Sequence, residues 1–198
     1  MTQPLPAIYL VRHGETAWTV SGQHTGLTDI PLTERGEHDA LQLGKHLRGI
    51  TATRVFTSPL QRAKRTCELT GFGAAAEVDS DLVEWDYGDY EGLTSAQIRQ
   101  KNPEWRLFRD GPPGGESVAA VSARADRVIS RLHALNGDAL VFSSGHFSRV
   151  LAARWLGLDA SHGRFFVLNT TTLSILGYDH DRTEPVIRLW NDVRPGRD

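Results

Sequence analysis

The segment Ala7-Ile8-Tyr9-Leu10-Val11-Arg12-His13-Gly14 decides the fold of this 198-residue chain. Its first five residues are apolar or aromatic, and the run stops at an arginine, a histidine and a glycine. A short apolar run with this ending predicts a buried strand whose carboxyl end meets a polar site. Two more short strands are predicted, at Arg54–Thr57 and Ala139–Phe142, and basic residues follow these as well.

Helical patterns separate the predicted strands. Capping residues and apolar spacing predict helices over Glu34–Arg48, Pro59–Leu69, Ser95–Lys101, Ser117–Leu135 and Phe147–Leu156. Residues 15–32 have no regular pattern and are expected to form a loop. Later strands are expected at Phe165–Leu168, Thr172–Tyr178 and Val186–Trp190, the last two as a hairpin.

This alternation of strands and helices predicts an α/β fold. We expect a single-domain three-layer sandwich, with a mostly parallel central sheet and helices on both faces. The domain is expected to span residues 1–198 and to carry a loop and helix insertion at about residues 92–116. The most loop-like part of that insertion is Gly111-Pro112-Pro113-Gly114-Gly115.

Composition limits the classes of partner. With 22 basic and 24 acidic residues, the net charge of −2 gives no field that would attract nucleic acid or anionic lipid. The first apolar run is too short for a signal peptide or a membrane span. A lone cysteine, Cys67, fits a reducing compartment, so a cytoplasmic protein is expected. The sequence leaves homo-oligomerisation open.

Basic side chains follow three of the predicted strands: Arg12 with His13, then Arg62, then His146. The carboxyl ends of parallel strands meet at one edge of a sheet, so these groups are expected to share a site. The planar guanidinium group of arginine can bind phosphate oxygens in pairs, and a neutral imidazole can attack phosphorus. A carboxylic acid such as Glu84 can protonate the leaving oxygen. Taken singly, each residue also has an ordinary structural interpretation, and only their joint placement favours phosphoryl chemistry.

The motifs that contain these residues resemble those of a known family. They are Leu10-Val11-Arg12-His13-Gly14-Glu15-Thr16, the TGLTDIPLT segment at residues 25–33, the TSPLQRA segment at 57–63, Glu84-Trp85-Asp86-Tyr87-Gly88, and Gly145-His146. In this order they look like the histidine phosphatase superfamily, in its cofactor-dependent phosphoglycerate-mutase-like branch. The resemblance runs from about Ile8 to Asn169.

The resemblance implies a role for each of these residues. His13 would be the nucleophile that becomes phosphohistidine, and Glu84 would protonate the leaving oxygen and then activate water. Arg12, Arg62 and His146 would form the phosphate pocket. The implied reaction needs no metal and no cofactor, and its implied substrate is a small phosphorylated metabolite.

Phosphatase and mutase activities both occur in that branch. Mutases resemble one another in longer chains with clustered basic residues, whereas the basic residues between Gln97 and Gly115 are spread out here. The mutases also tend to have asparagine where this chain has Thr19. A phosphatase is therefore favoured over a phosphoglycerate mutase, and a non-catalytic phosphate-binding module is a third alternative. The sedoheptulose-bisphosphatase-like subgroup is the most similar, which suggests a sugar phosphate or bisphosphate as substrate.

Other residues are predicted to bind the rest of the substrate. The candidates are Thr19, His24, Thr25, Gly26, Phe147 and, on the insertion, Arg109. His24 could equally be an exposed loop residue. Phe147 is expected to make its side of the pocket more apolar than in the mutases. Asp179-His180-Asp181 is interpreted as a hairpin turn, and no metal site is predicted.

Overall fold

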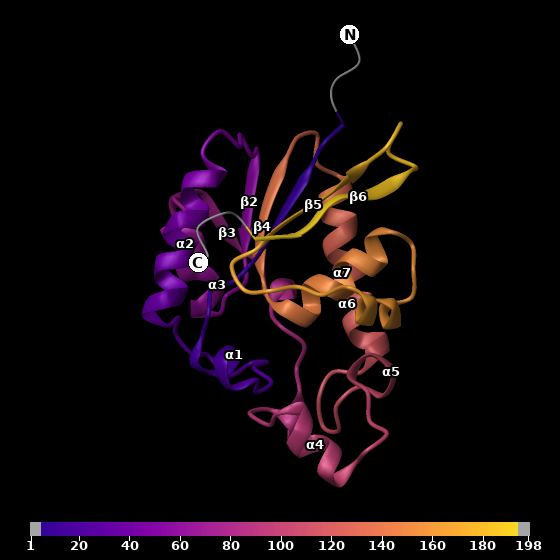
Figure 1. Cartoon of the computed structure of the whole chain (residues 1–198). Coiled ribbons are helices and arrows are strands. Elements are labelled where there is room, and N and C mark those ends of the chain that lie inside the picture. Colours follow the sequence, from indigo (N-terminus) through magenta and orange to yellow (C-terminus); the bar gives the residue numbers. More distant parts are fainter. Residues whose placement is uncertain (1–4, 194–198) are drawn as a thin grey trace.

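The computed structural model describes residues 5–193, and its strands form a single mixed sheet. The sheet order is β3-β2-β4-β1-β5-β6, and β1 is a central strand (Figure 1). The strands are β1 (Ile8–Arg12), β2 (Arg54–Thr57), β3 (Ala76–Val78), β4 (Ala139–Ser143), β5 (Leu173–Tyr178) and β6 (Pro185–Asp192).

Helices cover both faces of this sheet. Figure 1 shows α2 and α3 on one side and α6 and α7 on the other, with α1, α4 and α5 beyond one end of the strands. The helices are α1 (Ala17–Ser21), α2 (Glu34–Leu47), α3 (Gln61–Leu69), α4 (Ser95–Lys101), α5 (Leu107–Asp110), α6 (Val118–His133) and α7 (Gly145–Trp155). Short 3₁₀ helices occupy Gly73–Ala75, Ser80–Leu82, Gly88–Tyr90 and Ala160–Phe165. The predicted α/β sandwich is confirmed.

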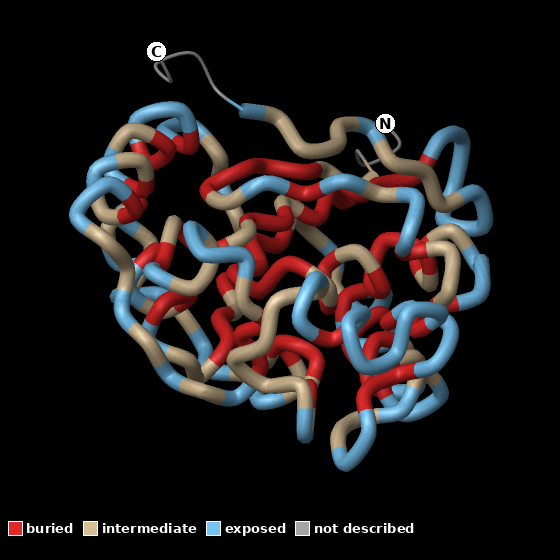
Figure 2. Tube along the Cα trace, turned by 60° about the horizontal axis from the view of Figure 1, so that its bottom comes forward, coloured by how far each residue is buried: buried red, intermediate tan, exposed pale blue. Residues whose placement is uncertain are grey.

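Strand direction decides where the site lies. The pairs β3–β2, β2–β4 and β4–β1 are parallel, while β1–β5 and β5–β6 are antiparallel. In the register, Arg12 lies opposite Ser143, and Thr57 lies opposite Phe142. The residues that follow β1, β2 and β4 therefore meet at one edge of the sheet, as the sequence predicts. Figure 2 views the molecule with this edge turned forward, and buried segments lie inside a largely exposed rim.

Successive side chains of β1 and β4 point to opposite faces of the sheet and pack into two separate hydrophobic cores. Ile8 and Leu10 pack with side chains of α6 and α7, whereas Val11 packs with side chains of α2 and α3. Leu140 and Phe142 in β4 face the α2–α3 side, and Ala139 and Val141 face the other. Both faces of these strands are apolar because both are covered by helices.

Capping residues define several helix starts. Thr33 and Ser117 accept backbone N–H bonds from Gly36 and Ala120, and Thr94 forms a reciprocal capping box with Gln97. The predicted start of α3 at Pro59 is wrong by two residues. Leu60 takes the cap position without a side-chain hydrogen bond, and the helix begins at Gln61.

Two predicted segments differ from the structure. Residues 15–32 contain the short helix α1, which begins at a capping box between Thr16 and Thr19. The predicted strand Phe165–Leu168 does not form. Its first residue ends a 3₁₀ helix, and Arg149 donates hydrogen bonds to the carbonyls of Gly163 and Arg164. Because β5 occupies the free edge of β1, no edge of β1 remains for this segment to pair with.

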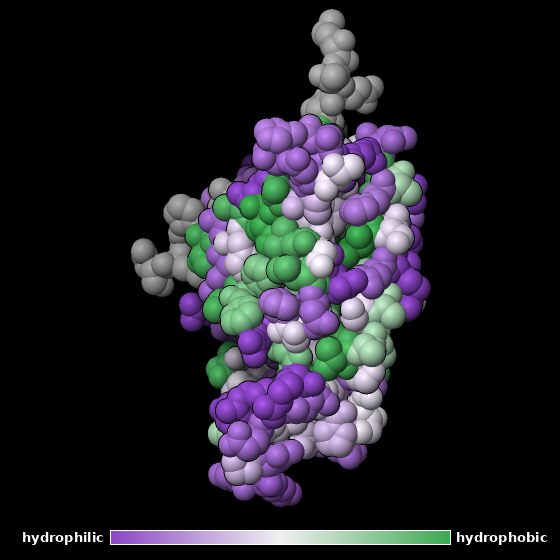
Figure 3. All heavy atoms as spheres, turned by 90° about the vertical axis from the view of Figure 1, so that its right-hand side faces the viewer, coloured by the Kyte–Doolittle hydropathy of each residue, from purple (hydrophilic) through white to green (hydrophobic). Residues whose placement is uncertain are grey.

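The sheet edge at β6 leaves apolar residues on the surface. Figure 3 shows that side of the molecule, with apolar residues gathered across its middle and polar residues over its lower end. Within residues 5–193, no helix is both long and apolar enough to cross a membrane.

Candidate active site

A cavity of about 210 Å³ opens at the carboxyl ends of β1 and β4. Arg12, His13, Glu84 and His146 line it, so four of the five predicted catalytic residues share one pocket. A cavity of this size suits a small metabolite rather than a protein segment.

His13 follows β1 and is almost fully buried. Its Nδ1 lies 2.8 Å from the carbonyl oxygen of Gly14. Because a carbonyl oxygen only accepts, Nδ1 carries the proton and the lone pair is on Nε2. Burial, together with the charges of Arg62 and Arg12, holds the pKa of His13 well below its usual range. The imidazole is therefore neutral at neutral pH.

The backbone around His13 is held from two directions. Its N–H donates to Ser143 of β4, and its carbonyl accepts from the N–H of Thr171, which has a positive φ of 56°. Gly14 permits a close approach, since a Cβ there would lie 2.7 Å from the carbonyl oxygen of Gly36. A larger residue at Gly14 would push the strand end away from α2.

The two predicted phosphate arginines lie differently. Arg12 lines the pocket and its Nη1 donates to the carbonyl of Leu168. Arg62 is fully buried behind the pocket, where its Nη atoms donate to the carbonyls of Thr25, Gly26 and Thr28. The Nε of each arginine is buried without a hydrogen-bond partner in the described part of the chain. A buried donor without a protein partner on each arginine fits the binding of an anionic group.

The carboxylate of Glu84 takes the place of a side-chain cap at the start of α7. Ser144 precedes α7 but makes no side-chain cap bond. The carboxylate of Glu84 instead accepts from the backbone N–H groups of His146 (2.9 Å, Oε2) and Phe147 (2.7 Å, Oε1). The N–H of Trp85 adds a second bond to Oε1. These bonds hold the carboxyl group at the helix start beside His146.

Tyr87, which the sequence did not single out, contacts His146 directly. The phenol oxygen lies 2.5 Å from Nδ1 of His146. Burial, with the charge of Glu84, raises the pKa of Tyr87 well above its usual range, so the phenol keeps its proton. Burial and the charge of Arg149 lower the pKa of His146, which is therefore neutral. The neutral phenol and the neutral imidazole therefore share one hydrogen bond at Nδ1.

The predicted substrate-binding residues divide into two groups. Thr19, His24 and Thr25 line the pocket, and the ring of His24 stacks on that of His146 at 6.0 Å between centroids. Gly26 lies behind the pocket, where its carbonyl binds Arg62. The side chain of Phe147 is buried in the core beneath Arg124, and its backbone N–H alone reaches the site.

Arg109 is not part of this pocket. It pairs with the adjacent Asp110 at 2.7 Å and borders a different groove, between α5 and the 3₁₀ helix Ala160–Phe165. Besides Arg12, the pocket is lined by Arg149, on α7. The sequence could have identified Arg149, because it follows His146 by three residues in a predicted helix and so lies on the same helix face.

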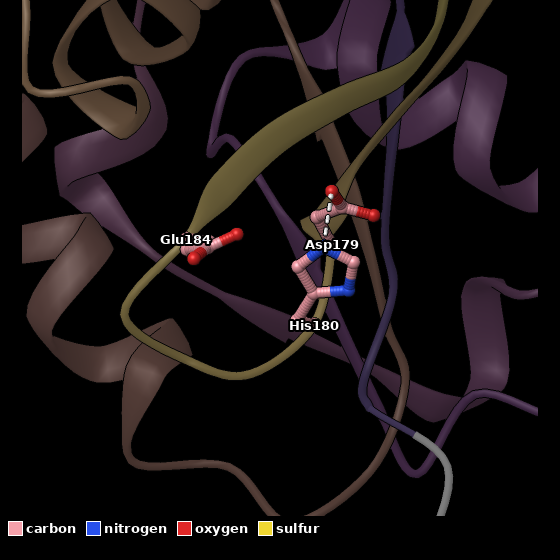
Figure 4. Close-up of side chains that lie close together, drawn as sticks. All are labelled: Asp179, His180 and Glu184. Carbon is pink, nitrogen blue, oxygen red and sulfur yellow. Dashed lines mark ion pairs between the residues drawn. The ribbon is translucent and has the colours of Figure 1, made fainter.

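Among residues 5–193, one group has ligand atoms close enough for a metal ion. Asp179, His180 and Glu184 have such atoms within 4.8 Å of one another, and Figure 4 shows them around the β5–β6 turn, where His180 pairs with Asp179. All three are exposed. Because Ile8 pairs with Leu176 and Val11 with Leu173, this turn lies at the end of the sheet opposite His13.

Comparison with known proteins identifies the family. The family model described as histidine phosphatase superfamily (branch 1) matches residues 8–193. An acid phosphatase from Mycobacterium tuberculosis is 41% identical over 177 residues, which cover 87% of each chain. Sedoheptulose 1,7-bisphosphatase from Saccharomyces cerevisiae is 37% identical over 216 residues, covering 93% of this chain and 79% of the relative. A probable phosphoglycerate mutase from Salmonella choleraesuis is 32% identical, covering 88% and 86%.

The fold agrees with a solved structure. That structure, of an open reading frame from Mycobacterium tuberculosis, superposes with a TM-score of 0.89 at 38% identity and covers 94% of this chain and 97% of its own. The matched range, residues 8–193, includes His13, Glu84 and His146. The chain belongs to the histidine phosphatase superfamily, branch 1.

Proposed function

We propose that the protein is a metal-independent phosphomonoesterase that forms a phosphohistidine on His13 and hydrolyses a small sugar phosphate. One observation carries this proposal: His13 is a buried, neutral imidazole whose Nδ1–H is held by Gly14, so that its Nε2 lone pair is free. A neutral imidazole attacks without a separate base, unlike a serine hydroxyl.

In the first step, Nε2 of His13 attacks phosphorus and the bond from phosphorus to the leaving oxygen breaks. The carboxyl group of Glu84 transfers its proton to that oxygen, and the alcohol departs. Oε2 accepts one backbone N–H and Oε1 accepts two, so Oε2 has the freer lone pair for this exchange. Arg12, Arg62 through its free Nε, and the Nε2–H of His146 stabilise the charge of the transferring group.

In the second step, water attacks the phosphohistidine. The carboxylate of Glu84 accepts the proton of the water, the nitrogen–phosphorus bond breaks, and inorganic phosphate and neutral His13 result. The names of two relatives, an acid phosphatase and a sugar bisphosphatase, support hydrolysis of a small phosphorylated metabolite.

The test is phosphate release in EDTA with trapping of the intermediate. Acid-labile, base-stable labelling of the protein by a ³²P-labelled sugar phosphate is expected, and loss of the label in His13→Ala. Labelling that persists in His13→Ala would exclude the mechanism. Isomerisation of 3-phosphoglycerate that outruns hydrolysis when bisphosphoglycerate is added would instead establish the mutase alternative. A protein that binds phosphate esters without any turnover would be a binding module.

A further inference from the structure

Arg149 is held rigidly at the wall of the catalytic pocket. Its Nε donates to the carbonyl of Gly163 at 3.0 Å, and one Nη donates to the carbonyl of Arg164 at 3.2 Å. The guanidinium stacks over the ring of Phe108, 4.6 Å from its centroid. The other Nη makes no hydrogen bond with residues 5–193, so this donor remains available in a preset orientation.

Arg149 forms no ion pair within residues 5–193, although the charge of Glu84 acts on it across the pocket. Each group that it contacts is a carbonyl or an aromatic ring, and no carboxylate in the described ranges lies within 4 Å of it. Burial lowers the pKa of this guanidinium, which reflects the removal of its charge from water. A largely desolvated cation without an anion is unfavourable for stability, so such a group commonly marks a binding site.

Arg124 on α6 shows the ordinary alternative. It also stacks on a phenylalanine, with its guanidinium 4.3 Å from the ring centroid of Phe147. Unlike Arg149, it forms a two-pronged ion pair with Glu116, at 2.6 and 2.9 Å. The fold therefore neutralises one buried arginine with its own carboxylate and leaves the other, the one that faces the pocket, without one.

The position of Arg149 separates it from the phosphoryl site. It lies one helical turn from His146, and side chains at this spacing have Cβ atoms about 5–6 Å apart. Arg12, Arg62 and His146 already serve the reacting phosphoryl group in the proposed function. We infer that Arg149 binds a second anionic group of the same substrate, a phosphate or a carboxylate, and so selects doubly anionic sugar phosphates. This inference rests on the proposed function for the identity of the first group.

Equilibrium binding tests the inference without depending on turnover. In a His13→Ala background, fructose 1,6-bisphosphate and fructose 6-phosphate are titrated by calorimetry, with 3-phosphoglycerate as the carboxylate arm. Arg149→Gln keeps an amide donor but removes the charge. It is expected to weaken binding of the doubly anionic ligand by about 10- to 100-fold and of fructose 6-phosphate by less than about 3-fold. A loss confined to fructose 1,6-bisphosphate or to 3-phosphoglycerate identifies phosphate or carboxylate as the second group.

Matched variants separate charge from folding. Arg149→Lys keeps the charge and is expected to retain most of the preference for two anionic groups. Arg164→Gln removes an equal charge from the neighbouring surface, where this arginine stacks on Phe165, and is expected to change neither affinity. If Arg149→Gln does not fold, the comparison of Arg149→Lys with wild type decides. Arg149→Lys keeps the charge, so a loss of its preference for ligands with two anionic groups would contradict the inference.

Equal weakening of both ligand classes by Arg149→Gln, or no change in either, would overturn the inference. Failure of the proposed function has a different signature, since wild-type protein would then release no phosphate from any of these esters while the binding preference persisted.

Discussion

The carboxyl ends of β1 and β4 lie side by side, and each presents a buried histidine to the same pocket. Both histidines are neutral, because burial lowers both pKa values. They differ in their partner at Nδ1, which is the carbonyl oxygen of Gly14 for His13 and the phenol of Tyr87 for His146. The carbonyl can only accept, so His13 presents a lone pair at Nε2, whereas the phenol can donate, and we expect His146 to present a proton there. In the proposed function, one hydrogen bond on the far side of each ring thus separates a nucleophile from a hydrogen-bond donor.

The largest expected effect comes from removing the lone pair on the β1 side. His13→Asn can keep an amide near Gly14 but has no nucleophilic nitrogen, so kcat is expected to fall by at least about 10⁴-fold. Steady-state phosphate release measures this, with the circular dichroism spectrum as a check of folding. Activity within tenfold of wild type would show that the two histidines do not differ in the way described.

The donor on the β4 side can be replaced by an amide. His146→Ala removes it and is expected to lower kcat by about 10²- to 10³-fold, the range found for the loss of one donor to a transition state. His146→Gln places an N–H near the former Nε2 and should recover at least tenfold of that loss. Equal activities of the two variants would contradict a donor role.

If the phenol of Tyr87 donates to Nδ1, it holds the proton of His146 on Nε2, and its removal is expected to have a smaller effect. Tyr87→Phe should lower kcat by about 10-fold and leave KM nearly unchanged, because the ring of His146 remains but its proton is free to move to Nδ1. Nitrogen-15 spectra of labelled protein would follow the proton. An unaltered Nε2–H signal together with unaltered kcat would exclude this role.

The smallest expected effect is on the pH dependence of stability, to which both His13 and His146 contribute. Their pKa values are lowered in the folded protein, so below pH 6.5 the unfolded chain takes up protons that the folded chain does not. The contribution to stability is complete above about pH 6.5 and declines as the pH falls below it. Thermal unfolding between pH 7.5 and 5 should show a shallower decline for His146→Asn than for wild type. The exposed His38→Asn serves as control, and a slope unchanged in His146→Asn would contradict the prediction.

The meeting of the strand ends at one edge of the sheet was predictable from the sequence, because strand ends are readable from local patterns. Arg12 and His13 end an apolar run, and the parallel pairing of β1 with β4 then brings His146 near them. The sequence was a poorer guide to the direction in which the side chains of α7 point. The helix was predicted to begin at Phe147 but begins at Gly145, which turns Phe147 into the core and places His146 and Arg149 on one face.

Long-range contacts explain the remaining differences. Phe165 to Leu168 has the composition of a strand, yet Arg149 binds the carbonyls before it and β1 has no free edge. Nothing local to Tyr87 indicates its contact with His146, which lies 59 residues away. The contacts of Arg62 are long-range as well, since its Nη atoms donate to carbonyls in the loop at residues 25–28.

The central place of β1 has a consequence for the order of events during synthesis. Its neighbours β4 and β5 are translated more than 125 residues and more than 160 residues after it begins. The carbonyl of His13 also receives its hydrogen bond from Thr171, and the N–H of Arg12 donates to Thr172. On a ribosome, His13 therefore emerges early, but its surroundings are not assembled until the segment around residues 171–178 has left the exit tunnel. A nascent chain stalled before that point is expected to have no phosphatase activity, so the enzyme becomes active late in translation.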